Sequence, residues 1–147
     1  MQTNLTQWDR RFLQLGKLVA SWSKDPSTRV GCILVDQQNR LISTGFNGLP
    51  AGVKDTEKRL NDRETKINLV IHAEENALLF AKGNTVGCTA YIWPLPPCAS
   101  CASKLIQARV RRIVSVAPDP GLEKRWRNSF TLADVLYAEA GVIVDIE

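Results

Sequence analysis

One histidine and one methionine occur in the 147 residues, and long hydrophobic runs are absent. Lys, Arg, Asp or Ser interrupts every apolar stretch before it reaches the roughly 18 residues that a membrane-spanning helix needs. The first eleven residues are polar and carry Asp9, Arg10 and Arg11, so they lack the apolar segment of a secretory signal. We therefore expect no membrane association, and a cytoplasmic protein whose four cysteines stay reduced.

The charge balance is mildly positive, with 19 Lys and Arg against 15 Asp and Glu, a net charge of +4. Basic residues gather at 109–112 and 124–127, where they form either a solvated surface or contacts to an anionic partner such as a nucleotide. Hydrophobic residues make up 44% of the chain, which is typical of a globular protein. A chain of this length buries a core without disulfides, so we expect one domain over residues 1–147.

The N-terminal segment has the periodicity of an amphipathic helix. Apolar residues recur at steps of three and four, which predicts a helix over 6–23 with one buried stripe. This stripe consists of Leu5, Trp8, Phe12, Leu15, Val19 and Trp22. Proline at position 26 ends the helix because the residue before a proline is disfavoured in the α region.

The rest of the chain begins with a hairpin and continues as alternating helices and strands. Strands over 30–35 and 40–44 flank a polar turn, and a long loop over 45–68 follows. Helices are then predicted over 73–82, 99–108 and 131–140, the last ending at Gly141, and strands over 89–93, 112–116 and 142–146. This alternation predicts an α/β protein with a single mixed sheet and helices on both faces.

The single histidine stands in a motif with chemical meaning. His72-Ala73-Glu74 opens one predicted helix, and Pro97-Cys98-Ala99-Ser100-Cys101 opens the next, with one strand between them. The pattern H-x-E followed by P-C-x-x-C matches the signature of zinc-dependent nucleobase deaminases. Cys98 and Cys101 share one helix face, and the helix N-terminus favours the thiolate forms that bind zinc.

The ligand count indicates a catalytic metal. His72, Cys98 and Cys101 supply three ligands to one Zn²⁺, which leaves a fourth position open for water. A structural site would need a fourth protein ligand, which could only be Cys32 or Cys88. Two thiolates weaken the power of zinc to acidify water, so we predict that Glu74 acts as general base and then as general acid.

Four sequence blocks resemble the cytidine deaminase superfamily, and within it the deoxycytidylate (dCMP) deaminases. The blocks are Ser23 to Gly31 (SKDPSTRVG), Ser43 to Pro50 (STGFNGLP), His72 to Ala77 (HAEENA) and Pro97 to Cys101 (PCASC). The resemblance implies a three-layer α/β/α fold, with a five-stranded mixed sheet flanked by helices. It also implies zinc-dependent hydrolysis of dCMP to dUMP with release of ammonia, a step toward thymidylate.

The same resemblance implies further residues and partners. Asn47 is expected to bind the sugar, although Asn-Gly is also a common turn, and the Ala73 backbone N–H is expected to contact the pyrimidine carbonyl. Regulation by dCTP and dTTP would use a pocket near Lys24 and Gly48. A homo-oligomer, a hexamer or a dimer, is implied as well. The residues that hold the 5′-phosphate stay open, with Arg125 and Arg127 as candidates by charge.

Other functions remain compatible with these motifs. A tRNA or polynucleotide deaminase shares the metal chemistry, but it would require a basic groove with exposed aromatic residues. We place Trp8 and Trp22 in the core, which argues against such a groove. A silent regulator that keeps zinc only for stability is a second alternative, and the presence of Glu74 argues against it. Deamination of dCTP, a free nucleoside or cytosine is a third.

Overall fold

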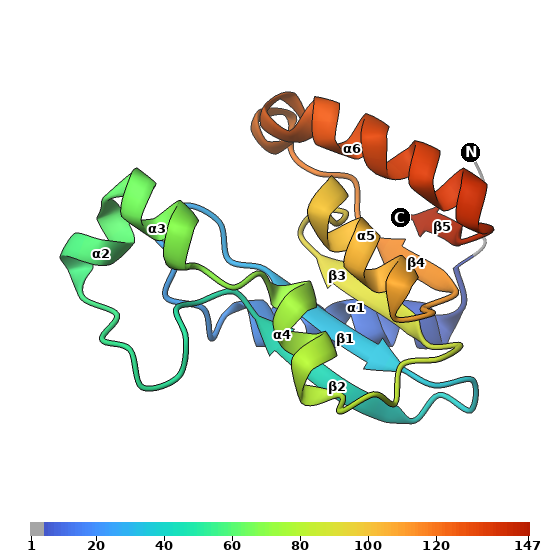
Figure 1. Cartoon of the computed structure of the whole chain (residues 1–147). Helices are drawn as coiled ribbons and strands as arrows, with labels where there is room; N and C mark the ends of the chain where they lie inside the picture. The colour runs from blue at the N-terminus through green and yellow to red at the C-terminus, as the bar shows by residue number, and fades with distance from the viewer. Residues whose placement is uncertain (1–4) are drawn as a thin grey trace.

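The computed structural model describes residues 5–147 and is built on one five-stranded sheet with the order β2-β1-β3-β4-β5 (Figure 1). β1 pairs antiparallel with both β2 and β3, whereas β3, β4 and β5 run parallel to one another. The strands span Gly31–Val35 (β1), Leu41–Phe46 (β2), Thr89–Trp93 (β3), Arg112–Ser115 (β4) and Ile143–Ile146 (β5). The predicted mixed sheet is confirmed, with every predicted strand present.

Helices cover both faces of the sheet, which confirms the expected three-layer α/β/α arrangement (Figure 1). One hydrophobic cluster lies under α1, and a second joins the sheet to α4, α5 and α6 on the opposite face. The helices span Gln7–Ala20 (α1), Glu57–Asn61 (α2), Arg63–Leu69 (α3), Ala73–Phe80 (α4), Ala99–Gln107 (α5) and Pro120–Ala140 (α6). Among the described residues, no helix combines the length and the apolar character needed to cross a bilayer.

Two glycines allow helices to approach the sheet closely. A Cβ atom at Gly31 would collide with the backbone of α1 at Gly16, and one at Gly45 would collide with the backbone of α4 at Ala73. Every residue of β1 is buried, so the central strand packs against helices on both faces. The glycine at the end of β2 thereby sets the position at which α4 begins.

The α1 helix starts as the sequence suggests but buries a different face. Thr6 and Asp9 form a capping box, in which each side chain accepts the other residue's backbone N–H. Phe12 and Val19 are buried as predicted, but Trp8 and Trp22 are 47% and 54% exposed. The placement of both tryptophans in the core was therefore wrong. The buried face is shifted instead, to Asp9, Phe12, Leu13, Gly16, Val19 and Ala20.

Two segments contain more helix than the sequence pattern predicts. The helix predicted over 131–140 begins at Pro120, where the Asp119 carboxylate caps the N–H of Leu122 at 2.9 Å. Its predicted stop at Gly141 is confirmed, with a left-handed φ of 74°. The segment expected to be a loop over 45–68 contains α2 and α3, neither of which buries a residue. Such short polar helices lack the apolar periodicity that predicts a helix.

Candidate active site

The helices α4 and α5 begin next to each other and bring the two sequence motifs together. His72 is the N-cap residue of α4, and Cys98 is the N-cap residue of α5. The Cys98 thiol accepts the backbone N–H of Cys101 at 3.5 Å, so the second cysteine is held beside the first. Glu75 accepts the backbone N–H of His72 at 3.1 Å and pairs with Lys104 at 3.2 Å. Glu75 therefore orients the start of α4.

His72, Cys98 and Cys101 form a group whose ligand atoms lie within 4.8 Å of one another. The His72 Nδ1 atom is 3.3 Å from the Cys101 sulfur and 3.6 Å from the Cys98 sulfur. A tetrahedral zinc ion with ordinary bond lengths holds an imidazole nitrogen and a thiolate about 3.6 Å apart. The donor set and its spacing therefore fit one zinc ion. Cys32 and Cys88 do not belong to this group, within the part of the chain that the structure describes.

The pKa values of the two thiols in this group are shifted in opposite directions. The hydrogen bond from the Cys101 thiol, aided by His72, lowers the pKa of Cys98 to about 4. The same interaction, together with burial, raises the pKa of Cys101 above its ordinary value. A dication between the sulfurs would stabilise both thiolates, because a metal ion is the largest local charge in such a site.

Glu74 is a buried carboxyl group, 4% exposed, in the first turn of α4. Burial, the largest influence, raises the pKa of Glu74 to about 7. A dication at the neighbouring ligands would lower this pKa again. Glu74 takes part in none of the ion pairs found between residues 5 and 147. Its hydrogen bond to Cys101 stays within the site, and no lysine or arginine of the described residues neutralises its charge.

One cavity of about 730 Å³ reaches this group of residues. His72, Glu74 and Cys98 lie in its wall, together with Ala73 and Asn47. Ala73 is the first residue of α4, so its backbone N–H has no acceptor inside the helix. The cavity also extends to the lobe formed by α2 and α3 and to the beginning of α6. It is large enough to hold a small organic ligand.

Asn47 lines this cavity while it also holds the neighbouring loop. Its amide nitrogen donates to the Thr28 carbonyl at 2.9 Å, and its amide oxygen accepts the Val30 N–H at 2.9 Å. These bonds use one donor and one acceptor position of the amide and leave one of each. The turn-like structural role and a ligand-binding role are therefore compatible at this residue.

Lys24 and Gly48 are not among the residues that line the cavity. The Lys24 ammonium pairs with Asp55 at 2.8 Å on the surface. Gly48 forms an isolated β-bridge with Ile71, with hydrogen bonds of 3.1 and 2.8 Å. Their assignment to an effector pocket stays a prediction.

Sequence reasoning missed several residues that build the site. Asp25 accepts the N–H groups of Ser27 and Thr28 at 2.8 and 3.1 Å and pairs with Lys66 at 3.2 Å, which anchors the lobe to this loop. The Ser129 hydroxyl accepts the Ala99 N–H at 2.7 Å, which joins α6 to the cysteine helix. The Asp25–Lys66 and Ser129–Ala99 contacts join residues 41 and 30 positions apart, and the motifs contain no signal for them.

Comparisons with known proteins agree with this geometry. Residues 6–117 match the family model described as the cytidine and deoxycytidylate deaminase zinc-binding region. An "uncharacterized deaminase in luxG 3'region" of Aliivibrio fischeri is 39% identical over 95% of this chain and 93% of its own length. The human deoxycytidylate deaminase is 32% identical over 92% of this chain and 77% of its own length.

A solved structure shares the fold. The dCMP deaminase of the cyanophage S-TIM5, in apo form, superposes with a TM-score of 0.73 at 22% identity, and the match covers 97% of this chain and 99% of that one. The family match covers the sequence from the first helix to the end of β4, including both metal-binding motifs. The chain belongs to the zinc-binding cytidine and deoxycytidylate deaminase family.

Proposed function

We propose that this protein hydrolyses the amino group of dCMP, which yields dUMP and ammonia. The observation that carries the proposal is the placement of His72, Glu74 and Cys98 in the wall of one cavity, with Cys101 beside them. The human and mouse deoxycytidylate deaminases, at 32% and 35% identity, and a probable deoxycytidylate deaminase of Caenorhabditis elegans, at 42%, support the choice of substrate.

His72, Cys98 and Cys101 would hold the zinc ion. When bound, zinc acts as a Lewis acid that makes water a stronger nucleophile near neutral pH. The remaining side chains of the site would then orient the pyrimidine and move protons. Because the three ligands belong to two helix starts that pack together, the site requires little rearrangement to accept the metal.

Glu74 is the proton carrier in this proposal. Its carboxylate takes one proton from the attacking water and delivers it to the ring nitrogen N3, and it then transfers the second proton to the departing amine. One carboxyl group beside the reacting carbon can perform both transfers, because the protons move between adjacent atoms of the substrate. The buried position of Glu74 keeps it within the cavity wall, away from surface charges.

The cavity wall also offers groups that orient the base and the sugar. The Ala73 N–H at the first turn of α4 would donate to the pyrimidine carbonyl, and Asn47 would bind the sugar through its remaining donor and acceptor. Both residues line the cavity that holds Glu74. A cytosine bound in this way would present its C4 carbon toward the metal ligands.

The test is ammonia release from cytosine, deoxycytidine, dCMP and dCTP, measured side by side, with a tRNA substrate as a fifth arm. We expect the highest kcat/KM for dCMP. A preference for the unphosphorylated nucleoside, or activity on tRNA alone, would contradict the proposed substrate. Metal analysis of the same preparation should find about one zinc per chain, since three ligands form one site. Removal of zinc with a chelator should abolish turnover.

We also propose a cytoplasmic location, assembly into a homo-oligomer, a hexamer or a dimer, and regulation by dCTP and dTTP near Lys24 and Gly48. The four cysteines of the chain are free thiols, which supports a reducing compartment. Repeating the dCMP assay with each effector tests the regulation. A Lys24→Ala variant that responds as the wild type does would remove Lys24 from the effector site.

A further inference from the structure

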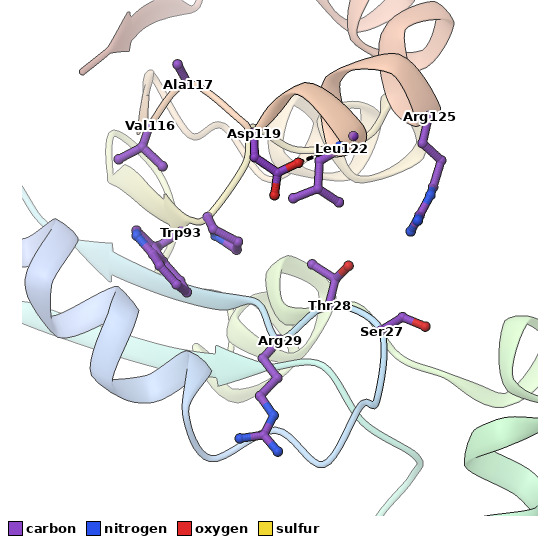
Figure 2. A pocket seen from close by; sticks show the side chains of 11 residues that line it. Ser27, Thr28, Arg29, Trp93, Val116, Ala117, Asp119, Leu122 and Arg125 are labelled. Carbon is purple, nitrogen blue, oxygen red and sulfur yellow. Dashed lines mark hydrogen bonds between the residues drawn. The ribbon is translucent and has the colours of Figure 1, made fainter.

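A second cavity of about 550 Å³ adjoins the one described above (Figure 2). It lies beyond the carboxyl ends of the parallel strands β3 and β4, where Trp93 and Val116 contribute to its wall. Open α/β sheets commonly bind ligands at this end of their strands. Ser27, Thr28 and Arg125 line both cavities, so they form a shared rim between them.

Arg125 is the cation of this rim. It is exposed, and it takes part in none of the ion pairs within the described part of the chain. Figure 2 shows its side chain extending from α6 toward the loop that carries Ser27 and Thr28. Arg127, two residues further along α6, pairs with Glu123 at 2.7 Å and lines neither cavity. The structure thus separates two arginines that the sequence left equivalent.

The other cations near the two cavities are less suited to bind an anion there. Lys66 lines the larger cavity, but Asp25 neutralises it at 3.2 Å, and both side chains are largely buried. Arg29 lines the second cavity only, and in Figure 2 its guanidinium points away from Arg125. Arg63 stands in the lobe, on the wall of the larger cavity alone. Arg125 is the one cation of the described chain that lines both cavities.

Hydroxyl groups accompany Arg125 at the rim. The backbone N–H groups of Ser27 and Thr28 already bind the Asp25 carboxylate at 2.8 and 3.1 Å, so they are unavailable to a ligand. In Figure 2 the two hydroxyls turn to the side on which the Arg125 guanidinium lies. The Ser27 hydroxyl accepts from Lys66 at 3.2 Å and can still donate its own proton. A guanidinium with neighbouring hydroxyls is suited to the oxygens of a phosphate group.

Beyond the rim, the second cavity presents a negative charge. The Asp119 carboxylate lines it and points into it, while it caps the Leu122 N–H at 2.9 Å (Figure 2). A phosphate at Arg125 would be attracted, whereas a second phosphate extending past the rim would approach Asp119. Like charges at short range disfavour such an extension.

We propose that Arg125 and the Thr28 hydroxyl bind the single 5′-phosphate of the nucleotide, and that Asp119 disfavours longer phosphate chains. This inference rests on the proposed deamination of a nucleotide in the larger cavity. It assigns the choice between a nucleoside, a monophosphate and a diphosphate to two charged residues on the first two turns of α6.

Calorimetry with the zinc-loaded protein tests the role of Arg125. The ligands are dUMP, which is the proposed product, and deoxyuridine, and neither of them is turned over. Arg125→Gln should weaken dUMP binding about ten- to a hundredfold, as expected for lost charge-assisted hydrogen bonds, and leave deoxyuridine within about twofold. Arg127→Gln, the matched control on the same helix, should leave both affinities unchanged. Equal losses for dUMP and deoxyuridine, no loss at all, or a selective loss in Arg63→Gln instead would overturn the assignment.

The role of Asp119 is tested with the diphosphate dUDP. Asp119→Asn keeps a side chain that caps the helix and removes the charge, so the fold should be retained. We expect wild type to bind dUDP more weakly than dUMP, and the variant to bind dUDP about three- to tenfold more tightly, as for a charge pair at modest distance near the surface. Wild-type affinity for dUDP equal to that for dUMP would contradict this role.

These probes also separate the inference from the proposed reaction. Because dUMP, dUDP and deoxyuridine are not turned over, the binding comparison can be completed even for a protein that fails to deaminate dCMP. Conversely, if the wild type deaminates dCMP and the Arg125→Gln variant binds dUMP with normal affinity, the inference is refuted and the proposed reaction is not affected.

Discussion

Two polar clusters lie on opposite faces of the sheet, and they differ in how completely their members are paired. In the Asp9 cluster, formed by Asp9, Tyr91, Arg112 and Asp145, two N–H groups of Arg112 bind Asp9 at 2.8 and 2.9 Å. The Tyr91 hydroxyl donates to the same carboxylate at 2.7 Å, and Arg112 also binds Asp145 at 2.9 Å. Burial opposes ionisation of Asp9, but these bonds hold its pKa well below the ordinary value.

The metal-binding cluster on the other face consists of His72, Glu74, Cys98 and Cys101, and these side chains contact one another. His72 lies near the sulfurs of Cys98 and Cys101, and Glu74 stays outside every ion pair of the described residues. The Glu74 carboxyl is hydrogen-bonded within the cluster, to Cys101, but no lysine or arginine among the described residues neutralises its charge. The Asp9 cluster is saturated, because its carboxylates are paired with an arginine, whereas the metal-binding cluster brings thiol and carboxyl groups together without one, an arrangement that suits a dication.

Glu74→Gln gives the largest expected effect. The amide keeps the shape of the side chain but cannot accept the proton, so kcat should fall roughly 10²–10⁴-fold, the usual contribution of a general acid–base. Zinc content, measured by elemental analysis, and the thermal transition should stay near wild type. Full activity in this variant would remove Glu74 from the mechanism.

Asp9→Asn breaks the saturated cluster. Loss of one partner from a buried ion pair costs about 3–5 kcal/mol, so the urea midpoint should fall, while kcat per folded molecule should not change. Asp36→Asn is the control, because the Asp36–Arg40 pair is on the surface. A similar loss of stability in both variants would show that the Asp9 cluster is no more important than a surface pair.

Wild type and the Asp9→Asn variant also test how the stabilisation from the Asp9 cluster depends on pH. Because the pKa of Asp9 is lowered in the native state, its stabilisation is complete above the unfolded value of about 3.9 and is lost as pH falls through the native value. The difference in unfolding free energy between wild type and Asp9→Asn should be constant from about pH 7 to 5 and shrink below about pH 4. If the difference in unfolding free energy instead grew as the pH fell, the pKa of Asp9 would have to be raised in the native state, not lowered.

Substitutions at Gly31, which faces α1, and Gly45, which faces α4, separate the roles of the two faces of the sheet. Gly31→Ala and Gly45→Ala each force a methyl group against a helix backbone, and overpacking of this kind costs about 1–3 kcal/mol. Only Gly45→Ala should also lower zinc affinity and kcat, because it displaces the start of α4. Gly48→Ala, where a Cβ meets nothing within 4 Å, is the control for stability. Equal catalytic losses in both variants would argue against separate roles for the two faces.

Tyr137→Phe gives the smallest effect. The Tyr137 hydroxyl is the one buried side-chain oxygen or nitrogen in the described residues without a hydrogen-bond partner. An unsatisfied buried hydroxyl is unfavourable, so its removal should raise the unfolding free energy by up to about 1 kcal/mol. A clear decrease in the melting temperature would indicate that the hydroxyl has a partner in solution.

The motifs predicted which residues meet at the candidate site because their spacing reflects local geometry. His72 and Cys98 were expected at helix starts, and both are N-cap residues. The single mixed sheet with helices on both faces followed from the hairpin and the alternation of helices and strands, whereas the strand order became apparent only in the structure. Trp8 was misplaced because the buried face of α1 is rotated toward Asp9, which binds the Tyr91 hydroxyl. Trp22 was misplaced because α1 ends at Ala20, before the predicted stripe does.

Contacts between distant segments could not be predicted in this way. The Lys66–Asp25 pair, the Ser129–Ala99 bond and the position of Arg125 at the rim each depend on how separate elements pack. The start of α6 is different, because Asp119-Pro120 is a helix-start signal and Leu122, Trp126 and Phe130 follow at helical spacing, so the sequence analysis missed a signal that was present. The arrangement of charged residues around the two cavities therefore became apparent only in the structure.

The lobe of α2 and α3 buries none of its own residues and joins the 25–28 loop through Lys66, yet it supplies one wall of the cavity. For protein engineering, this makes the lobe an exchangeable module. Libraries confined to residues 56–70 could retune which nucleotides enter, while the metal ligands and the sheet beneath them stay untouched. Evolution of new substrate ranges in this scaffold could proceed by the same route.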